Sequence, residues 1–440
     1  MLKPEDFAIK TLGEAQVVSP IKFSTVRGDG IVNFIGNDVT IPYAINSDAE
    51  PELKGLEFES AGPRKEIYFR PGEVTAAIMT CGGLCPGLND AIRAIVMQLH
   101  YKYEVKKILG IRFGQQGLDP RTGAEPVELT PEGVKDIHLH GGSALGTSRG
   151  AVDPEVMVDS LVRHGINLLF SLGGDGTQKG NHAIFQAADR RGLKIAVVGV
   201  PKTIDNDISF VYRTFGLDTA VTIAREAVRC AHYEAVSAYN AVGLVKVMGR
   251  QSGFIAGFTV LAANDANFCL IPEIPFTLDG ENGLLRLLEE RLNRRHHAVI
   301  VTAEGAGQEL MKHEQEAATY DASGNIRLGD IGFFLKNRII EHFQAKNIPI
   351  DLKYIDPSYM LRSVPANAND SMFAAALGRR AVDAGMAGKT DLLIGYWHDY
   401  FTHVPLPLAI SRRKQVDPEG ELWREVLSTT GQPVAQAAGL

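Results

Sequence analysis

Residues 168–207 read LLFSLGGDGTQKGNHAIFQAADRRGLKIAVVGVPKTIDND, and this stretch decides the fold. An apolar run at 168–172 leads into a glycine turn, a helical pattern follows at 182–191, and a second apolar run occupies 195–200. The order strand, turn, helix, strand is typical of a parallel sheet with helical connections. We therefore predict an α/β protein with mostly parallel sheets and helices on both faces.

Polar side chains follow both predicted strands at the point where each strand ends. Asp175 and Thr177 follow the first strand. The second is followed by Lys202, Asp205 and Asp207. Because open parallel sheets bind ligands at the carboxyl ends of their strands, these residues form a candidate site. Three aspartates and a lysine suit metal-assisted chemistry.

The glycines of the first turn indicate the kind of ligand. Gly173, Gly174 and Gly176 surround Asp175 and let a ligand approach the backbone, while the following helix directs free N–H groups at it. A phosphate fits such a turn, but Asp175 would repel it unless Mg²⁺ bridged the two. Two other interpretations remain open: a loose dinucleotide fingerprint that continues to Gly180, and a tight turn with a solvated aspartate.

Composition excludes several classes of protein. The chain has 440 residues, a formal net charge of −7 and four cysteines. The negative charge gives no general attraction for nucleic acid or anionic membranes, and so few cysteines do not suggest a disulfide framework. Without a membrane-length apolar run or a signal-peptide core at the start, the expected location is the cytoplasm.

The pattern outside the central stretch predicts two Rossmann-like lobes and an extension. Residues 1–72 carry short β-like runs and are expected to form a small β-rich N-terminal extension. The first lobe is predicted from 73–217 and 366–440, with a long returning helix at 366–388. Residues 218–365 form the second predicted lobe, because strands and helices alternate there.

The first lobe is expected to begin with a buried strand at 74–80. The loop CGGLCPGL follows at 81–88, and Asn89 or Asp90 is a predicted cap of the next helix. This loop is not a Walker loop, since no Gly-Lys-Ser/Thr follows its glycines. Cys81 and Cys85 have no histidine cluster nearby, so a zinc site is not expected.

Four motifs in sequence order, TCGGLCPGLNDAIR, SLGGDGTQKG, VPKTIDND and VKVMGRQSG, resemble the phosphofructokinase family. The similarity runs from about residue 74 to about residue 388. It is closest to the branch with a long amino-terminal extension found in plants, trypanosomatids and some bacteria. The resemblance implies a glycolytic 6-phosphofructokinase that transfers the γ-phosphoryl group of ATP to the 1-hydroxyl of fructose 6-phosphate with Mg²⁺. It also implies a homo-oligomer, a tetramer or a dimer.

The resemblance assigns roles to individual residues. Asp205 is the expected general base, although an Asx-type turn remains the alternative for the Asp-Asn-Asp sequence. Asp175 is the expected Mg²⁺ ligand, directly or through water. The expected catalytic set is Asp205, Arg149, Lys202, Asp207 and Arg250. The expected nucleotide-binding set is Gly82, Arg149, Gly150, Gly174, Asp175, Gly176 and Thr177. The expected sugar-phosphate set is Thr203, Ile204, Asp205, Met248, Gly249, Arg250, Glu304, Lys353, Tyr359 and Arg362.

The sequence departs from the common bacterial pattern of the family at several positions. Tyr359 stands where that pattern has His, Lys353 where it has Arg, and Ala241 where it has an Arg that reaches the sugar phosphate of an adjacent subunit. Phosphate binding must therefore rely on other groups, and the allosteric behaviour of the bacterial enzymes is not assumed.

The phosphoryl donor is decided by two further positions. Pyrophosphate-dependent members usually have Asp at the position of Gly176 and Lys at the position of Lys202, whereas common bacterial ATP enzymes have Gly at both. Glycine at 176 leaves room for the α-phosphate of a nucleotide, and Lys202 can serve either donor. We therefore predict ATP, with pyrophosphate as the alternative. The rival functions are a dinucleotide-dependent oxidoreductase and a non-catalytic sugar-phosphate sensor.

Overall fold

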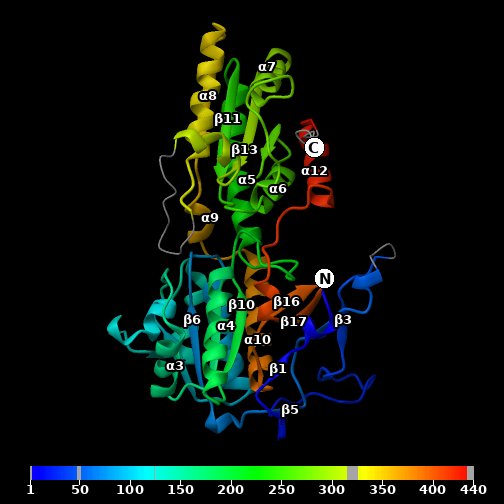
Figure 1. Ribbon diagram of the computed structural model, residues 1–440, viewed down its shortest axis with the longest axis vertical. Helices are drawn as coiled ribbons and strands as arrows, with labels where there is room; N and C mark the ends of the chain where they lie inside the picture. The colour runs from blue at the N-terminus through cyan, green and yellow to red at the C-terminus, as the bar shows by residue number, and fades with distance from the viewer. Residues whose placement is uncertain (1, 47–50, 123, 315–325, 434–440) are drawn as a thin grey trace. The chain divides into compact units, whose positions relative to one another are not determined.

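The computed structural model describes residues 2–46, 51–122, 124–314 and 326–433 (Figure 1). The chain divides into two compact units. The first contains the residues up to Thr203, Ile208–Gly216 and Ser363–Arg413. The second contains Ile204–Asp207, Leu217–Arg362 and the residues from Lys414 onward.

This division differs at the carboxyl end from the one expected from the sequence. The described residues after Arg413 belong to the second unit, whereas 366–440 was expected to lie wholly in the first lobe. The described part of residues 1–72, the expected β-rich extension, belongs to the first unit. Residues 1, 47–50 and 434–440 of these expected segments lie outside the described residues.

Among the described residues, the first unit is built on a nine-stranded sheet with the order β3-β4-β17-β16-β10-β9-β6-β7-β8. Strands β16, β10, β9, β6 and β7 are parallel, and the others are antiparallel to their neighbours. The strands are β3 (Thr40–Pro42), β4 (Glu57–Ser60), β6 (Thr75–Thr80), β7 (Lys107–Ile111), β8 (Val127–Glu128), β9 (Leu168–Gly173), β10 (Ala196–Pro201), β16 (Leu392–Trp397) and β17 (Tyr400–Pro405).

Helices cover both faces of this sheet, as predicted (Figure 1). They include α1 (Leu88–Met97), α2 (Pro131–Val134), α3 (Pro154–Arg163), α4 (Asp175–Arg190), α10 (Ala368–Met386) and α11 (Leu406–Ala409). On one face, Met79, Leu169 and Val197 pack with apolar residues of α3 and α4. On the other face, α1 packs against α10, and α10 contacts β9, β10 and β16. Every residue of β6, β9 and β10 is buried, which explains their continuous apolar runs.

The amino-terminal residues add strands to the first unit. Strand β4 pairs with β17, and β3 pairs with β4, so this segment extends the central sheet. Two further pairs are β1 (Lys10–Thr11) with β15 (Lys389–Thr390) and β2 (Val17–Val18) with β5 (Glu66–Ile67). Phe7 and Phe58 lie 4.9 Å apart between ring centroids and share a buried cluster with Phe210 and Val404. The extension therefore belongs to the core of the first unit.

Among its described residues, the second unit contains a four-stranded parallel sheet with the order β12-β13-β11-β14. These strands are β11 (Ala241–Val247), β12 (Phe268–Leu270), β13 (His297–Ala303) and β14 (Asp351–Ile355). The helices are α5 (Leu217–Ser237), α6 (Phe254–Ala263), α7 (Leu284–Arg295), α8 (Ile331–Ala345), α12 (Glu421–Thr430) and, at the end of the segment, α9 (Met360–Ser363). Leucines of α7 and apolar residues of α8 form one buried cluster with the sheet. Helices α5 and α6 contact the same strands and each other, and α12 packs on α6.

Two predicted helix starts need correction. Helix α4 begins at Asp175 rather than at residue 182, because the glycine turn passes directly into the helix. Helix α1 begins at Leu88 with Gly87 as its N-cap at φ 99°, so Asn89 and Asp90 lie inside the helix. The side chain of Asn89 instead donates to the carbonyl of His140 at 2.9 Å and accepts from the N–H of Ala144 at 2.8 Å. No helix in the described ranges is long and apolar enough to cross a membrane.

Candidate active site

Three neighbouring parallel strands of the first unit end at the same edge of the sheet. The register pairs Thr80 of β6 with Leu172 of β9, and Gly173 of β9 with Pro201 of β10. The ladder continues for one residue, because the N–H of Lys202 donates to the carbonyl of Gly173 at 3.1 Å. The loops that carry Gly82, Asp175 and Lys202 therefore start side by side, as the strand pattern predicts.

Asp175 is the first residue of α4, and Gly174 is the N-cap. Backbone N–H groups at the start of a helix favour an anion there. The Asp175 carboxylate is 11% exposed and pairs with two cations through Oδ2, namely Lys179 at 2.9 Å and Arg413 at 3.3 Å. Arg413 was not anticipated from the sequence, since it lies 238 residues further along the chain.

Gly176 occupies the next position of the helix and is exposed. A Cβ atom built there would meet nothing within 4 Å, and its backbone has no positive φ. Neither packing nor conformation therefore requires glycine at this position. By contrast, the following residue, Thr177, is 7% exposed and belongs to the buried start of α4.

Lys202 is buried at 5% exposure, which is uncommon for a lysine. Its ammonium donates to the carbonyl of Gly83 at 2.6 Å and thereby joins the loop after β10 to the loop after β6. A Cβ atom on Gly82, which has φ +79°, would lie 3.6 Å from this ammonium. A fixed positive charge next to a glycine loop is suited to binding phosphate oxygens.

The loop that carries Arg149 lies against the same glycine loop. The N–H of Gly82 donates to the carbonyl of Ser148 at 3.0 Å, and Gln116 donates to the carbonyl of Arg149 at 3.0 Å. The backbone around Arg149 and Gly150 is therefore fixed next to Gly82, while the Arg149 side chain is exposed. A guanidinium in this position can reach a phosphate bound at the strand ends.

The TIDND sequence continues into the second unit, which contains Ile204, Asp205 and Asp207. The hydroxyl of Ser252 donates to the carbonyl of Asp205 at 2.8 Å. The N–H of Lys414 donates to the carbonyl of Asp207 at 3.0 Å. These bonds fix the backbone on both sides of Asn206, which has a left-handed conformation at φ 54°.

Two adjacent strand ends of the second unit bring together predicted sugar-phosphate residues. The N–H of Glu304 donates to the carbonyl of Val247 at 2.9 Å, and the N–H of Gly305 donates to the carbonyl of Gly249 at 3.1 Å. Gly249 has φ +132°, and a side chain there would meet the carbonyl of Ser252 at 2.6 Å. Glycine is thus required where the loop carries Met248 and Arg250 past Glu304.

The Glu304 carboxylate interacts electrostatically with three cations and with Asp356. Burial raises the pKa of Glu304, while the charges of Arg250, Lys246 and Arg362 lower it in part. Arg250 and Arg362 were predicted members of this site, and the electrostatics link both to Glu304. A carboxylate among guanidinium groups can accept hydrogen bonds from sugar hydroxyls while the cations bind a phosphate.

Lys246 was missed by the sequence analysis. Its ammonium lies 2.9 Å from Oδ2 of Asp356 and 3.1 Å from Oδ1 of Asp330. Burial alone would lower the pKa of Lys246, but these hydrogen bonds outweigh it and the pKa is raised. The only signal in the sequence was a lysine inside the apolar run AVGLVKV.

The remaining predicted sugar-phosphate residues lie on or after β14. Lys353 is paired in register with Gly243, four residues before the end of β11, and its ammonium lies 3.1 Å from Oδ1 of Asp351. It is therefore set back along the strand from the loop of Arg250. The Arg362 guanidinium lies over the ring of Tyr359, 5.2 Å from its centroid. Tyr359 itself is 74% exposed.

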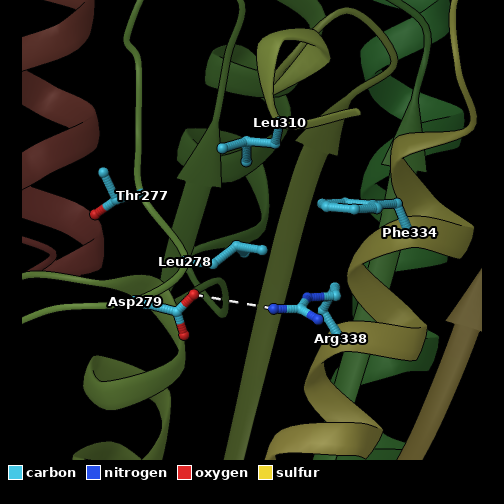
Figure 2. Close-up of a pocket in the computed structure, with 6 residues that line it drawn as sticks. All are labelled: Thr277, Leu278, Asp279, Leu310, Phe334 and Arg338. Atoms are coloured by element: carbon cyan, nitrogen blue, oxygen red, sulfur yellow. Dashed lines mark ion pairs between the residues drawn. The ribbon is translucent and has the colours of Figure 1, made fainter. Parts of the chain in front are cut away.

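The second unit also has a separate pocket of about 400 Å³ (Figure 2). It is lined by Thr277, Leu278, Asp279, Leu310, Phe334 and Arg338. Arg338 and Asp279 approach to 3.9 Å across it, and Arg338 also pairs with Glu341 at 3.2 Å. None of the predicted site residues lines this pocket.

Within the described ranges, no group of three or more His, Cys, Asp or Glu side chains is arranged to hold a metal ion. Mg²⁺ does not require one, because it is usually held by one or two carboxylates together with phosphate oxygens of the substrate. Asp175 at the start of α4 fits a Mg²⁺ ion of this kind.

Comparison with known proteins identifies the family. The phosphofructokinase family model matches residues 75–385. The ATP-dependent 6-phosphofructokinase of Borreliella burgdorferi is 50% identical over 438 residues, covering 98% of this chain and 97% of that protein. The enzyme of the same name from Trypanosoma brucei brucei is 47% identical over 388 residues, covering 88% of this chain and 78% of that protein.

A solved structure shares the fold. The pyrophosphate-dependent phosphofructokinase from Marinobacter aquaeolei matches with a TM-score of 0.67 at 23% identity, covering 81% of this chain and 91% of that one. The matched residues 75–385 include the glycine loop, the Asp175 turn, TIDND and the Arg250 loop. This chain belongs to the phosphofructokinase family.

Proposed function

We propose that the protein transfers the γ-phosphoryl group of ATP to the 1-hydroxyl of fructose 6-phosphate, producing fructose 1,6-bisphosphate and ADP. The observation that carries this proposal is the common edge at which β6, β9 and β10 end, with Gly82, Asp175 and Lys202 in their loops. Relatives that cover nearly the whole chain bear the name of this activity.

The first unit supplies the nucleotide half of the reaction in this proposal. The glycine loop at Gly82, the start of α4 and the loop of Arg149 offer backbone N–H groups and a guanidinium to phosphate oxygens. Lys202 adds a buried charge whose position is fixed by Gly83. Phosphoryl transfer depends mainly on positioning and on charges of this kind.

The second unit supplies the sugar-phosphate half. Arg250 and Arg362 would bind the 6-phosphate, and Glu304 would accept hydrogen bonds from sugar hydroxyls. Met248 and Gly249 shape the loop, and Tyr359 stacks on the guanidinium of Arg362. Lys353 is the weakest member of the set, because its ammonium is already paired with Asp351.

Asp205 is the proposed general base. As the oxygen of the 1-hydroxyl forms its bond to the γ-phosphorus, the hydroxyl proton passes to the Asp205 carboxylate and ADP leaves. The backbone carbonyl of Asp205 accepts a hydrogen bond from Ser252, which fixes the backbone from which the carboxylate extends. Asp207 is placed two residues further along the same loop by its bond to Lys414.

Asp175 would hold Mg²⁺ together with phosphate oxygens of ATP. When bound, the ion would neutralise part of the charge on the phosphates. Asp175 fits this task because it is a carboxylate at the start of a phosphate-directed helix, already oriented by cations on Oδ2.

ATP rather than pyrophosphate is the proposed donor. A Cβ atom on Gly176 would meet nothing within 4 Å, so glycine presents no side chain to the α-phosphate of ATP, whereas a carboxylate there would repel it. Two relatives whose matches cover 98% of this chain are named ATP-dependent 6-phosphofructokinases. A homo-oligomer is proposed from the family resemblance, and light scattering of the purified protein would measure it.

The proposal is tested by incubating purified protein with fructose 6-phosphate, ATP and Mg²⁺ and detecting fructose 1,6-bisphosphate through an aldolase-coupled assay. Formation of product that requires all three components is the expected result. Tight binding of sugar phosphate without turnover would instead favour a sensor. Nicotinamide-dependent absorbance changes would favour an oxidoreductase, and either result contradicts the proposal.

A further inference from the structure

A short segment near the carboxyl end of the chain lies along the TIDND loop. Arg413 forms an antiparallel bridge with Ile208, and the N–H of the next residue, Lys414, donates to the carbonyl of Asp207 at 3.0 Å. The N–H of Val416 is bonded to Oε1 of Glu273 at 2.8 Å. The backbone of residues 413–416 is thus fixed at both ends, and its position depends on the loop that carries Asp205 and Asp207.

The side chain of Arg413 reaches Asp175 from this segment. Its guanidinium donates to Oδ2 of Asp175 at 3.3 Å, and Lys179 donates to the same oxygen at 2.9 Å from one turn further along α4. Asp175 is only 11% exposed, and Arg413 is 30% exposed. A partly buried carboxylate with two cations on one oxygen has little freedom to rotate.

We propose that Arg413 is a positioning residue for Asp175 in phosphoryl transfer. By binding Oδ2 it fixes the plane of the carboxylate before Mg²⁺ and ATP arrive, so that little reorganisation is needed when they bind. This inference rests on the proposed role of Asp175 as the Mg²⁺ ligand.

The two cations that contact Asp175 come from different parts of the chain. Lys179 is on the same helix as Asp175, so its contact is a local pair between positions i and i+4. Arg413 comes from a distant segment that is bonded to the backbone of the catalytic loop. The contact of Arg413 with Asp175 is therefore long-range, over 238 residues of sequence, whereas that of Lys179 is local to α4.

The neighbouring residue, Arg412, provides a matched control. Its guanidinium lies over the ring of Phe210, 5.1 Å from the centroid, rather than on a carboxylate of the site. Replacing Arg412 removes the same charge and the same volume one residue away.

The test uses Arg413→Gln, Arg413→Lys and Arg412→Gln in the full chain. Titration calorimetry measures the affinity for ATP with and without Mg²⁺, and thermal unfolding checks that each variant is folded. Groups that orient a metal-ligating carboxylate typically contribute about 10- to 100-fold to metal affinity or activity. We therefore expect Arg413→Gln to reduce the Mg²⁺-dependent gain in ATP affinity by about 10-fold or more.

The remaining outcomes are equally defined. The affinity of Arg413→Gln for ATP without Mg²⁺ should change little. Arg413→Lys should recover part of the Mg²⁺-dependent gain in ATP affinity. Arg412→Gln should retain this gain in full. An unchanged gain in Arg413→Gln would overturn the inference. An equal loss with and without Mg²⁺ would also overturn it, because Arg413 would then contact the nucleotide itself. If Mg²⁺ does not affect ATP binding in the unmodified protein, the proposed role of Asp175 is what fails.

Discussion

The ammonium of Lys202 donates a hydrogen bond to the carbonyl of Gly83 at 2.6 Å and so joins two loops at the carboxyl edge of the first sheet. Lys202→Met would retain most of the buried volume while removing the charge and this bond. We expect turnover to fall roughly 10²-fold or more, as for other preorganised donors, with a smaller change in the KM for fructose 6-phosphate. Steady-state kinetics measure both, and an unchanged kcat would exclude Lys202 from the reaction.

Asp205→Asn tests the general base. The amide has nearly the same shape but cannot take the hydroxyl proton, so turnover should fall roughly 10²–10⁴-fold while fructose 6-phosphate still binds. Asp265→Asn is a suitable control because Asp265 is partly exposed and its ion pair with His232 is long, at 3.8 Å. A variant at position 205 within tenfold of the unmodified enzyme would remove Asp205 from this role.

Gly176→Asp tests the basis of donor choice. The fold should tolerate the substitution, since a Cβ there meets nothing within 4 Å. The added carboxylate should repel the phosphates of ATP and lower kcat/KM for ATP roughly 10-fold or more. Gly72→Asp is the matched control, because Gly72 is also exposed and also has open space around it. Equal effects of the two substitutions on ATP kinetics would show that position 176 does not select the donor.

Lys246→Met tests the charge network of the second unit. The substitution leaves Asp330 and Asp356 without the ammonium that lies within 3.1 Å of both. We expect the free energy of unfolding to fall by about 1–3 kcal/mol and the KM for fructose 6-phosphate to rise, because Glu304 loses a nearby positive charge. Urea unfolding and kinetics provide the measurements. If neither the free energy of unfolding nor the KM for fructose 6-phosphate changes, Lys246 has no part in the site.

His403 makes the stability of the first unit sensitive to acid. Burial lowers the pKa of His403 to about 4, although a hydrogen bond to Glu59 at 3.2 Å partly opposes the shift. Between pH 6.5 and about 4 the unfolded chain therefore binds a proton that the folded protein does not. Stability should decrease as the pH falls through this window, by up to about 3 kcal/mol from this group.

His403→Gln checks that prediction. Urea unfolding at several pH values should give a weaker pH dependence in the variant between pH 6.5 and 4. Glu59 adds to the pH dependence at the acid end of this window: despite its burial, hydrogen bonds from His403 and Lys389 hold its pKa well below the usual 4.5, so the unfolded chain protonates it there and the folded protein does not. The slopes are therefore compared between pH 6.5 and about 5, where His403 dominates. Identical slopes for the two proteins would contradict the role of His403.

The parallel core of the first unit was predictable because its strands are buried on both faces. The apolar runs at 168–172 and 195–200 correspond to β9 and β10, within one residue at each end. Side chains placed directly after those strands, such as Asp175 and Lys202, were predictable for the same reason. Strand ends in one parallel sheet must lie at one edge.

Contacts between distant segments were not predictable in the same way. Nothing in the local pattern of residues 1–72 indicates that β3 and β4 extend the central sheet through β17. Arg413 appears in the sequence as part of a basic run, and its contact with Asp175 depends on how the chain returns after α10. In the sequence, Lys246 is a single charged residue within an apolar strand. Its role could not be predicted because its partners, Asp330 and Asp356, lie on other elements.

The most direct measurement is the steady-state kcat/KM of the purified protein for ATP and for pyrophosphate, each at saturating fructose 6-phosphate and Mg²⁺. The site described here, with an open Gly176 at the start of α4 and a buried Lys202 on the glycine loop, predicts a higher kcat/KM for ATP. A higher kcat/KM for pyrophosphate would contradict the proposed donor, and no fructose 1,6-bisphosphate with either would contradict the proposed reaction.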